Sequence, residues 1–400
     1  MNNKNLPQVL YISLDGIMEP LGQSQVLKYL EKLSENYEIS LISFEKLNDL
    51  ENTKLLNETI KKCSDKSIKW YRLNYRNGYF GLGQIINIFS LFFIPFYILI
   101  KKNIAIMHIR SYMPGIFLPI LSLVFKYKLI FDIRGFWADE KHDRHNWKKQ
   151  SFKYKFFKKL EKYLIDKASY IVTLTESSKK IIAQNFNKPK SSIRVIPTCV
   201  DLSEFKRLMT IKDSRSLTIG YLGSVDTAYD FKKFCFFVSQ INDNFKAQIN
   251  LKILTKQSHN EVMKLIDLKS LEGVNFDIKF VERQHLSKEL SSFDILGFYL
   301  KENFSISASM PTKIAESLSC GIPIVCNSFN TDIKQLIESN RIGLTYNFDD
   351  EFSESNLKKL LSLINDPQTP ERCSNVAKEY FSIDIGVRNY ASLYKELTIK

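Results

Sequence analysis

The 400-residue sequence lacks several short patterns that identify common enzyme classes. No two aspartates are spaced as Asp-x-Asp, so the usual clamp for a metal-bound diphosphate has no candidate. There is neither a Gly-x-Gly-x-x-Gly dinucleotide fingerprint nor a Gly-x4-Gly-Lys-Ser/Thr phosphate loop. His142 and His145 lie among acidic residues, but their spacing is not that of an ordered zinc site. These absences predict a protein without a metal or a cofactor.

Disulfide and export signals are also missing. The six cysteines show no Cys-x-x-Cys spacing, which favours a reducing compartment. The first residues lack the apolar core and the small-residue cleavage site of a signal peptide. We therefore expect a cytoplasmic protein.

Charge is distributed unevenly along the chain. Residues 1–200 hold 32 Lys and Arg against 17 Asp and Glu, a net of +15, whereas residues 201–400 hold 25 against 26, a net of −1. A basic half suits an anionic partner such as phospholipid, a lipid pyrophosphate or nucleic acid. Excess lysine that only keeps the protein soluble explains the charge equally well. The lysines are not organised into a known nucleic-acid-binding module, so we expect no nucleic-acid partner.

Short runs rich in Ile, Val and aromatic residues alternate with longer helical stretches, which is typical of parallel, doubly wound α/β sheets. The first half has such runs at 9–15, 39–45, 68–74, 104–110, 128–134, 170–175 and 192–197. The second half has them at 217–223, 249–255, 274–282, 293–300, 322–327 and 343–347.

This alternation predicts two Rossmann-like domains, at 1–200 and 217–378, because 400 residues exceed one ordinary domain. The polar segment 201–216 is the expected hinge. Two such domains in tandem predict a central cleft, since ligands of these folds collect at the carboxyl ends of strands.

The stretch from Asn77 to Ile100 has 24 residues without a charge and is long enough to span a membrane. A span here would put strands 68–74 and 104–110 on opposite sides of the bilayer, which would break up the sheet. We therefore reject a transmembrane helix. A helix that lies in the membrane interface, or one buried against the sheet, remains open.

The segment 146–167 predicts an amphipathic helix. Its expected core stripe consists of Phe152, Phe156, Leu160, Tyr163 and Leu164, and its expected lysine face of Lys148, Lys155, Lys159 and Lys162. Such a face is more often simply solvated. Because this helix, the uncharged stretch and the excess charge share one domain, we favour docking to an anionic membrane surface.

The strongest local signal is SASMPTKIAESLSCGIPIVCN, at 307–327. It reads as a loop, a helix at about 311–319, a glycine that ends the helix, and a buried strand. Free amides at the helix start, together with Thr312 and Lys313, form a plausible diphosphate site. Glu316 could accept hydrogen bonds from ribose hydroxyls, or it could be an ordinary acid near a helix start.

This block resembles the PTKxxExLxxGxPxV donor motif of the family-4 glycosyltransferases of bacterial surface-polysaccharide synthesis. Other segments resemble the same family in the same order, from about residue 21 to 394: LGQSQVLKYLEKL (21–33), FDIRGFWADE (131–140), VTLTESSKKII (172–182), VIPTCVDLSEF (195–205), YLGSVDTAYDF (221–231) and FSIDIGVRNYASLY (381–394). The resemblance implies a GT-B fold, in which two Rossmann-like domains face a cleft, and a closing C-terminal helix at 379–400.

The resemblance also implies a donor site in the second domain. Glu316 matches the second acid of the family's Glu-x7-Glu pair, while Ala308 stands at the first. Gly223 and Ser224 stand where the family often has Gly-Arg. We therefore assign donor binding to Thr312, Lys313, Glu316, Gly223 and Ser224. Whether Lys232 or Lys233 replaces the missing arginine stays open.

In the first domain, Arg134 follows a predicted strand and occupies about the place where relatives carry a histidine. We assign Arg134 and Glu316 as catalytic residues and expect Gly22, Asp139 and Glu140 to contact the acceptor. A structural pairing of Arg134 with neighbouring carboxylates is the alternative. In this family, stabilisation of the departing diphosphate is the main expected catalytic effect.

The sequence thus predicts a retaining, metal-independent glycosyltransferase of hexosyl or N-acetylhexosaminyl type. Its expected partners are a nucleotide-sugar donor and a saccharide or lipid-linked acceptor, and its expected place is the inner face of the cell membrane. Two alternatives are a non-catalytic donor-binding subunit, suggested by Ala308 and Ser224, and a sugar-nucleotide epimerase of the same fold.

Overall fold

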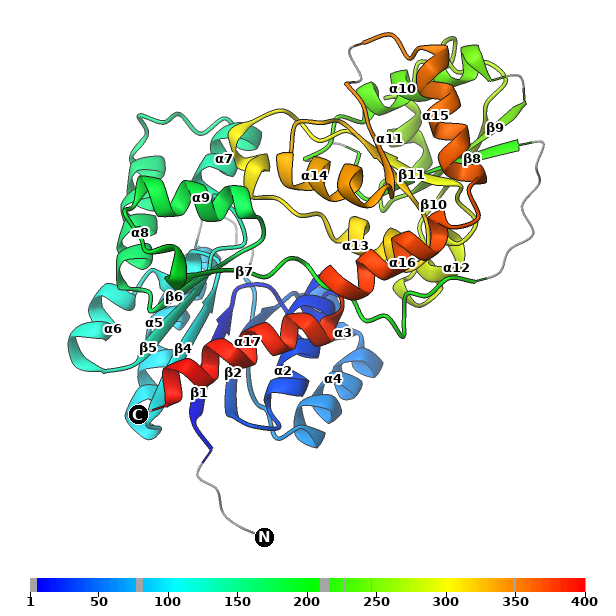
Figure 1. Cartoon of the computed structure of the whole chain (residues 1–400). Helices are drawn as coiled ribbons and strands as arrows, with labels where there is room; N and C mark the ends of the chain where they lie inside the picture. Colours follow the sequence, from blue (N-terminus) through cyan, green and yellow to red (C-terminus); the bar gives the residue numbers. More distant parts are fainter. Residues whose placement is uncertain are drawn as a thin grey trace. The chain divides into compact units, whose positions relative to one another are not determined.

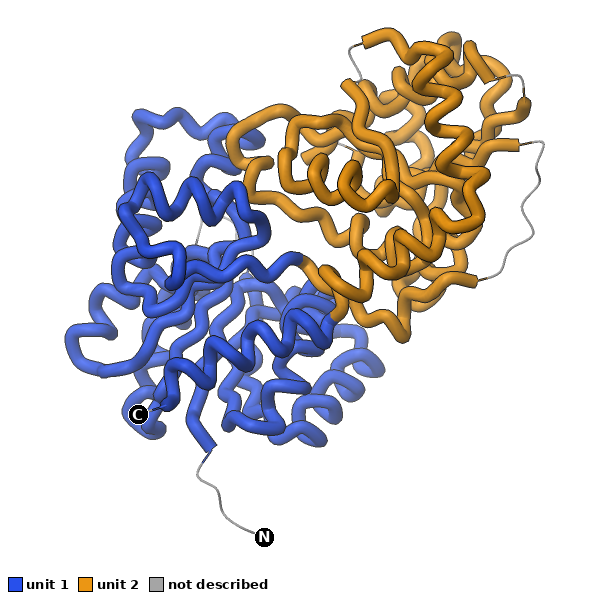
Figure 2. Tube along the Cα trace, in the orientation of Figure 1, with its two compact units in different colours: residues 1–197, 383–400 blue, residues 198–382 orange. Residues whose placement is uncertain are grey.

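The computed structural model describes residues 6–76, 82–208, 216–225, 228–245, 247–347 and 350–399. The chain forms two compact units, residues 1–197 with 383–400 (unit 1) and residues 198–382 (unit 2), coloured separately in Figure 2. The start of the uncharged stretch, at 77–81, and most of the expected hinge, at 209–215, lie outside the described residues.

Unit 1 is built on a seven-stranded parallel sheet with the order β3-β2-β1-β4-β5-β6-β7 (Figure 1). Its strands are β1 (Gln8–Ser13), β2 (Glu38–Glu45), β3 (Lys69–Asn74), β4 (Ile104–Arg110), β5 (Lys128–Asp132), β6 (Tyr170–Thr173) and β7 (Ile193–Val195). Its α-helices include α1 (Pro20–Gly22), α2 (Lys28–Leu33), α3 (Leu47–Glu51), α4 (Thr53–Asp65), α5 (Leu82–Lys101), α6 (Leu118–Val124), α7 (Trp137–His145), α8 (Phe152–Lys167), α9 (Glu176–Asn185) and α17 (Ile383–Thr398).

Unit 2 repeats the plan with a six-stranded parallel sheet in the order β10-β9-β8-β11-β12-β13. Its strands are β8 (Ser216–Leu222), β9 (Gln248–Leu254), β10 (Asn275–Lys279), β11 (Ile295–Phe298), β12 (Ile324–Cys326) and β13 (Gly343–Thr345). Its α-helices include α10 (Phe231–Asn244), α11 (His259–Met263), α12 (Arg283–Leu290), α13 (Thr312–Ser319), α14 (Thr331–Asn340), α15 (Glu354–Asn365) and α16 (Thr369–Tyr380).

All thirteen predicted strands are found, because strands of two-sided parallel sheets are nearly continuous apolar runs that stand out in a sequence. The core of each unit consists of these strands and the apolar faces of the helices. The prediction of two Rossmann-like α/β domains is confirmed.

The C-terminal helix α17 packs on unit 1 through two buried tyrosines. The Tyr390 hydroxyl donates to Oδ2 of Asp132 at 2.9 Å, and the Tyr394 hydroxyl lies 2.7 Å from Nδ1 of His108. Asp132 ends β5 and His108 lies in β4, so α17 is bound to the centre of the unit 1 sheet.

Within the described residues, helix α5 is long and apolar enough to cross a membrane, judged by length and composition alone. The strands before and after it, β3 and β4, belong to the same parallel sheet. In this fold α5 is therefore a crossover helix of unit 1. Asn87 holds its first turns, since its side-chain amide bonds both the backbone N–H and the carbonyl of Arg76 at 3.1 Å.

The amphipathic helix is shorter than predicted and its core stripe is partly wrong. Helix α7 ends at His145 and is followed by Asn146, whose backbone is left-handed, and α8 begins only after Ser151, which caps it. Lys148 therefore lies outside the helix. Leu160 and Leu164 are buried as predicted, but Phe152 is 83% and Phe156 38% exposed. Glu161, paired with Lys158 and Tyr112, fills the buried face instead.

Candidate functional site

The strand order of unit 2 reverses between β8 and β11, and ligands of such sheets bind at this point, outside the strand ends. Gly223 follows β8 directly with a φ of +113°, which residues with a side chain rarely adopt. A Cβ atom at this position would lie 3.3 Å from Nζ of Lys313. Gly223 thus keeps the backbone close to the Lys313 amino group.

Lys313 carries a buried amino group surrounded by three aromatic rings. Its Nζ lies 3.5 Å from the ring centroid of Tyr229, 4.9 Å from that of Tyr221 and 5.2 Å from that of Phe298. In the described part of the chain this Nζ has no hydrogen-bond partner. Burial lowers the pKa of Lys313 to about 7, against the opposing charge of Glu316. The rings favour the charged ammonium, whereas burial without a counter-charge disfavours it. An anion at this point would supply the missing counter-charge and would therefore bind strongly.

Glu316 lies one turn further along α13 and is also buried. Burial raises the pKa of its carboxyl group, and the adjacent Arg283 guanidinium opposes this shift. Nη1 of Arg283 is 3.2 Å from Oε1 of Glu316, and Nε is 3.3 Å from Oε2 of Glu204. A ribose hydroxyl would therefore share the Glu316 carboxylate with Arg283. Arg283 was not predicted from the sequence, and it is the order of the strands that puts this residue, at the start of α12 after β10, near the carboxyl edge of the sheet.

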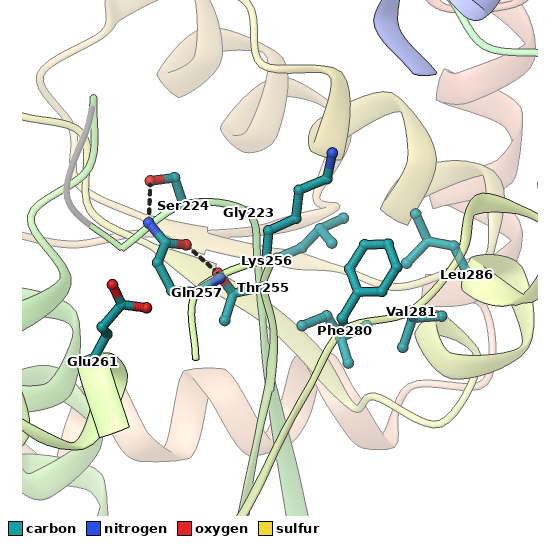
Figure 3. Close-up of a pocket in the computed structure, with 11 residues that line it drawn as sticks. Gly223, Ser224, Thr255, Lys256, Gln257, Glu261, Phe280, Val281 and Leu286 are labelled. Carbon is teal, nitrogen blue, oxygen red and sulfur yellow. Dashed lines mark hydrogen bonds between the residues drawn. The ribbon is translucent and has the colours of Figure 1, made fainter. Parts of the chain in front are cut away.

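A pocket of about 620 Å³ opens at the ends of β8, β9 and β10 (Figure 3). It is lined by Leu222, Gly223, Ser224, Leu254, Thr255, Lys256, Gln257, Glu261, Phe280, Val281 and Leu286. The amide of Gln257 donates to the Ser224 hydroxyl at 3.0 Å and accepts from Thr255, which fixes the polar side. Phe280 is 59% exposed at the opposite side, so its ring can stack on a planar group. The volume and the mixed lining fit a nucleoside.

The structure places the predicted donor residues in this part of unit 2. Gly223 and Ser224 line the pocket, and Gly223 joins it to Lys313. Thr312 opens helix α13, which begins after Pro311 and ends at Ser319, as the sequence predicts. Of the two lysines left open, Lys233 donates to the Tyr299 hydroxyl at 3.2 Å, and Lys232 lines a separate pocket beside α10.

The corresponding point of unit 1, between β1 and β4, holds a buried arginine that the sequence analysis missed. Arg110 ends β4, and its guanidinium lies 3.4 Å from Asp15 and 3.6 Å from Asp132. Arg134 lies 3.9 Å from the other oxygen of Asp132. The backbone of Arg134 is left-handed, with a φ of +54°, a conformation that costs a residue with a side chain about 1 kcal/mol.

Gly22 closes the loop after β1. A Cβ atom on Gly22 would lie 1.9 Å from the carbonyl oxygen of Gly16, so no other residue fits there. Glu45 holds the same loop, because its carboxylate accepts the backbone N–H groups of Ile17 at 2.9 Å and Met18 at 3.0 Å. Burial raises the pKa of the Glu45 carboxyl group. The loop is thus a fixed part of unit 1.

Asp139 and Glu140 lie in α7 and both have partners. Asp139 is buried and accepts from the Tyr154 hydroxyl at 2.6 Å and from Lys158 at 2.9 Å. Glu140 pairs with Arg144 at 2.7 Å. Their expected contact with the acceptor stays a prediction.

No group of three or more His, Cys, Asp or Glu side chains is arranged for a metal ion within the described ranges. Nδ1 of His142 lies 2.6 Å from the carbonyl oxygen of Trp147, so this ring supports the end of α7.

Comparison with known proteins gives matches for both units. The family model described as Glycosyltransferase Family 4 matches residues 26–204, and that described as Glycosyl transferases group 1 matches residues 216–366. A comparison with curated proteins gave no match.

Solved structures resemble the chain over nearly its whole length. Sucrose-phosphate synthase of Thermosynechococcus elongatus has a TM-score of 0.69 at 11% identity, covering 98% of this chain and 99% of that one. HepE of Anabaena, in complex with UDP and glucose, has a TM-score of 0.65 at 12% identity, covering 97% and 99%. A putative UDP-N-acetylglucosamine 2-epimerase of Listeria monocytogenes has a TM-score of 0.59 at 13% identity, covering 98% and 96%. At these identities the likeness shows the fold.

The two parallel sheets and these neighbours define the GT-B fold. With one family model on each unit, the chain is a glycosyltransferase similar to those of family 4.

Proposed function

We propose that this glycosyltransferase moves a hexosyl or N-acetylhexosaminyl residue from a nucleotide sugar to a saccharide or lipid-linked saccharide. Transfer proceeds with retention and without a metal ion, at the inner face of the cell membrane, in the synthesis of a surface polysaccharide. The observation that carries the donor assignment is the Lys313 amino group, which is buried, surrounded by rings and next to Gly223 at the edge of the nucleoside-sized pocket.

The donor fits these residues in a simple order. The base stacks on Phe280, the ribose reaches Glu316, and the diphosphate lies over Gly223 against the Lys313 ammonium. A protonated Lys313 supplies the charge that a metal ion supplies in other diphosphate sites. This supports metal-independent transfer, together with the absence of Asp-x-Asp from the sequence.

In the reaction, the bond between the anomeric carbon and the diphosphate oxygen breaks, and the electron pair leaves with the nucleoside diphosphate. The acceptor hydroxyl oxygen forms the new bond to the anomeric carbon on the same face, and its proton passes to the departing phosphate oxygen. Lys313 stabilises the negative charge that develops on this leaving group. Neighbouring structures solved with UDP and glucose support this donor class.

A thermal-shift screen of the full chain across nucleotide sugars identifies the donor, because a ligand bound only by the folded state raises the melting temperature. Turnover is then measured with that donor and short saccharide or prenyl-pyrophosphate acceptors, with and without EDTA. We expect product with retained configuration in both. Loss on chelation, restored by magnesium, would contradict the metal-independent assignment.

The same experiment separates two alternatives. A donor-binding subunit, consistent with Ala308 and Ser224, would give the melting shift without product. An epimerase, which shares the fold of the Listeria neighbour, would convert the donor with no acceptor present.

A further inference from the structure

Helix α5 exposes a row of large apolar side chains instead of burying them. Ile85, Phe89, Phe93, Tyr97 and Ile100 recur every three or four residues and are each 47–59% exposed. The opposite side of the helix, with Leu91 and Ile98, is buried. Only 33% of the apolar window Gly83–Lys101 is buried, so α5 does not have the environment of a core helix.

The row continues onto helix α6, which follows β4 in the chain. The rings of Phe92 and Phe117 lie 5.4 Å apart and those of Phe96 and Phe125 5.5 Å apart, so α5 packs against the α6 segment. The last residues of α6, Leu123 and Val124, are 83% and 67% exposed.

Helix α8 adjoins α6 through a side-chain contact. The Ser122 hydroxyl of α6 lies 2.8 Å from the Tyr163 hydroxyl of α8, and Phe152 at the start of α8 is 83% exposed. We call the exposed apolar side chains of α5 and the end of α6 the α5–α6 face.

Cations predominate along this face, although Glu38 pairs with Lys102, just after α5, at 2.6 Å. The sequence has no acidic residue between Asp65 and Asp132, a stretch that carries nine Lys and Arg. Lys101, at the end of α5, and Lys126, just after α6, are exposed. On α8, Lys155, Lys159 and Lys162 are exposed as well. An apolar row bordered by cations matches a layer of acyl chains below anionic headgroups.

We propose that the α5–α6 face docks unit 1 on an anionic lipid bilayer, with α5 and the end of α6 in the interfacial layer and the lysines against the headgroups. The helix does not span the bilayer, since β3 and β4 belong to one sheet. This proposal identifies the surface that holds the protein at the membrane. It rests on the proposed function in one respect only, namely that docking lets the enzyme reach a lipid-linked acceptor.

The insertion is tested directly on the full chain with a label at Leu123→Cys. All six native cysteines are buried, so a thiol-reactive, environment-sensitive fluorophore reacts selectively at the new position. Leu47→Cys is the matched control, because Leu47 is 58% exposed on α3 of the same unit. With vesicles of equal parts phosphatidylglycerol and phosphatidylcholine carrying brominated acyl chains, we expect quenching at 123 and none at 47.

Substitutions then test the energetics by co-sedimentation with the same vesicles. Phe93→Glu and Leu123→Glu should each weaken binding by about tenfold or more, because each removes a large apolar side chain from the lipid. Leu47→Glu should have no effect. Lys155→Gln, Lys159→Gln and Lys162→Gln should each weaken binding on the order of fivefold, and vesicles of phosphatidylcholine alone should bind less.

Two results would overturn the proposal. One is binding to vesicles without quenching at 123, which would place the contact elsewhere. The other is a dimer of the free protein that Leu123→Glu dissociates, since a second copy would then cover the face. Donor binding, followed by thermal shift without lipid, should be unchanged in all these variants, so a failure of the docking surface is distinguishable from a failure of the proposed reaction.

Discussion

The two units hold their cations differently at the same point of the same kind of sheet. In unit 1, Arg110 lies between the carboxylates of Asp15 and Asp132. In unit 2, Lys313 is surrounded by aromatic rings, and its amino group has no hydrogen-bond partner in the described residues. A buried cation that already has its counter-charges is compensated and gains little from a further anion. A buried cation without them costs stability until an anion arrives. The comparison therefore supports the proposal that the diphosphate binds to unit 2.

The largest effect is expected from removal of the Lys313 charge. Lys313→Met should lower kcat/KM by about 100-fold or more, because a buried cation would no longer face the developing charge. Donor affinity by calorimetry and initial rates check this. Lys232→Met and Lys233→Met are the matched controls, and an equal loss in Lys233→Met would move the diphosphate site toward Tyr299.

The Lys313→Met variant also tests how much folding stability the buried Lys313 charge costs. The folded-state pKa of Lys313, about 7, is below its ordinary value of 10.5, so the unfolded chain binds more protons between these values. The cost is fully present below pH 7 and disappears as pH rises toward 10.5. Lys313→Met should therefore melt higher than the parent at low pH, and this gap should narrow as pH rises. A lower melting temperature at every pH would contradict the buried-cation argument.

Glu316→Ala should have the next largest effect. Loss of a charged hydrogen bond to the ribose costs about 1.5–3 kcal/mol, which lowers donor affinity by about 10- to 100-fold. Glu204→Ala is the control, because Glu204 holds the same Arg283 from a more exposed position. Equal losses in the two variants would show that Glu316 acts only through Arg283.

Donor affinity should also depend on pH through Lys313. A bound diphosphate raises the pKa of the ammonium, so binding takes up a proton once pH exceeds the free-state value of about 7. The dissociation constant should then rise by at most about tenfold per pH unit above 7 and stay flat below it. Calorimetry in buffers of different ionisation enthalpy measures the proton directly. If the dissociation constant of Lys313→Met still rises with pH, a group other than Lys313 takes up the proton.

The sequence predicted the strands and the secondary structure of the 307–327 block well, because both depend on local patterns. Apolar runs identify parallel strands, and the segment around Pro311 and Gly321 contains its own helix start and stop. It could not predict Arg283 or Arg110 as site residues. Each follows or ends an apolar strand like many surface residues, and only the strand order puts them at a ligand edge.

Phe152 was assigned to the core for a related reason. Helical spacing shows which side chains share a face, but the start of the helix and the neighbouring elements decide whether that face is covered. Here α8 starts at Phe152 itself, and the buried face is shifted to Leu160, Glu161, Leu164 and Ile165.

The smallest effect on the donor is expected from a change in unit 1 that costs stability. Tyr390→Phe removes the hydroxyl that donates to buried Asp132, while Arg110 and Arg134 remain beside that carboxylate. The loss should be about 1–2 kcal/mol in the free energy of unfolding, because the Asp132 oxygen loses a donor that water cannot replace. Tyr163→Phe is the matched control, since its hydroxyl bonds Ser122 in an exposed position and should cost less than about 0.5 kcal/mol. Urea unfolding measures the free energy of unfolding of both variants.

Donor affinity should stay within about twofold of the parent in both variants, because the proposed donor residues all lie in unit 2. A clear loss of donor affinity in Tyr390→Phe would mean that the paired arginines of unit 1 also contact the donor, and the assignment of the diphosphate to unit 2 alone would have to be abandoned.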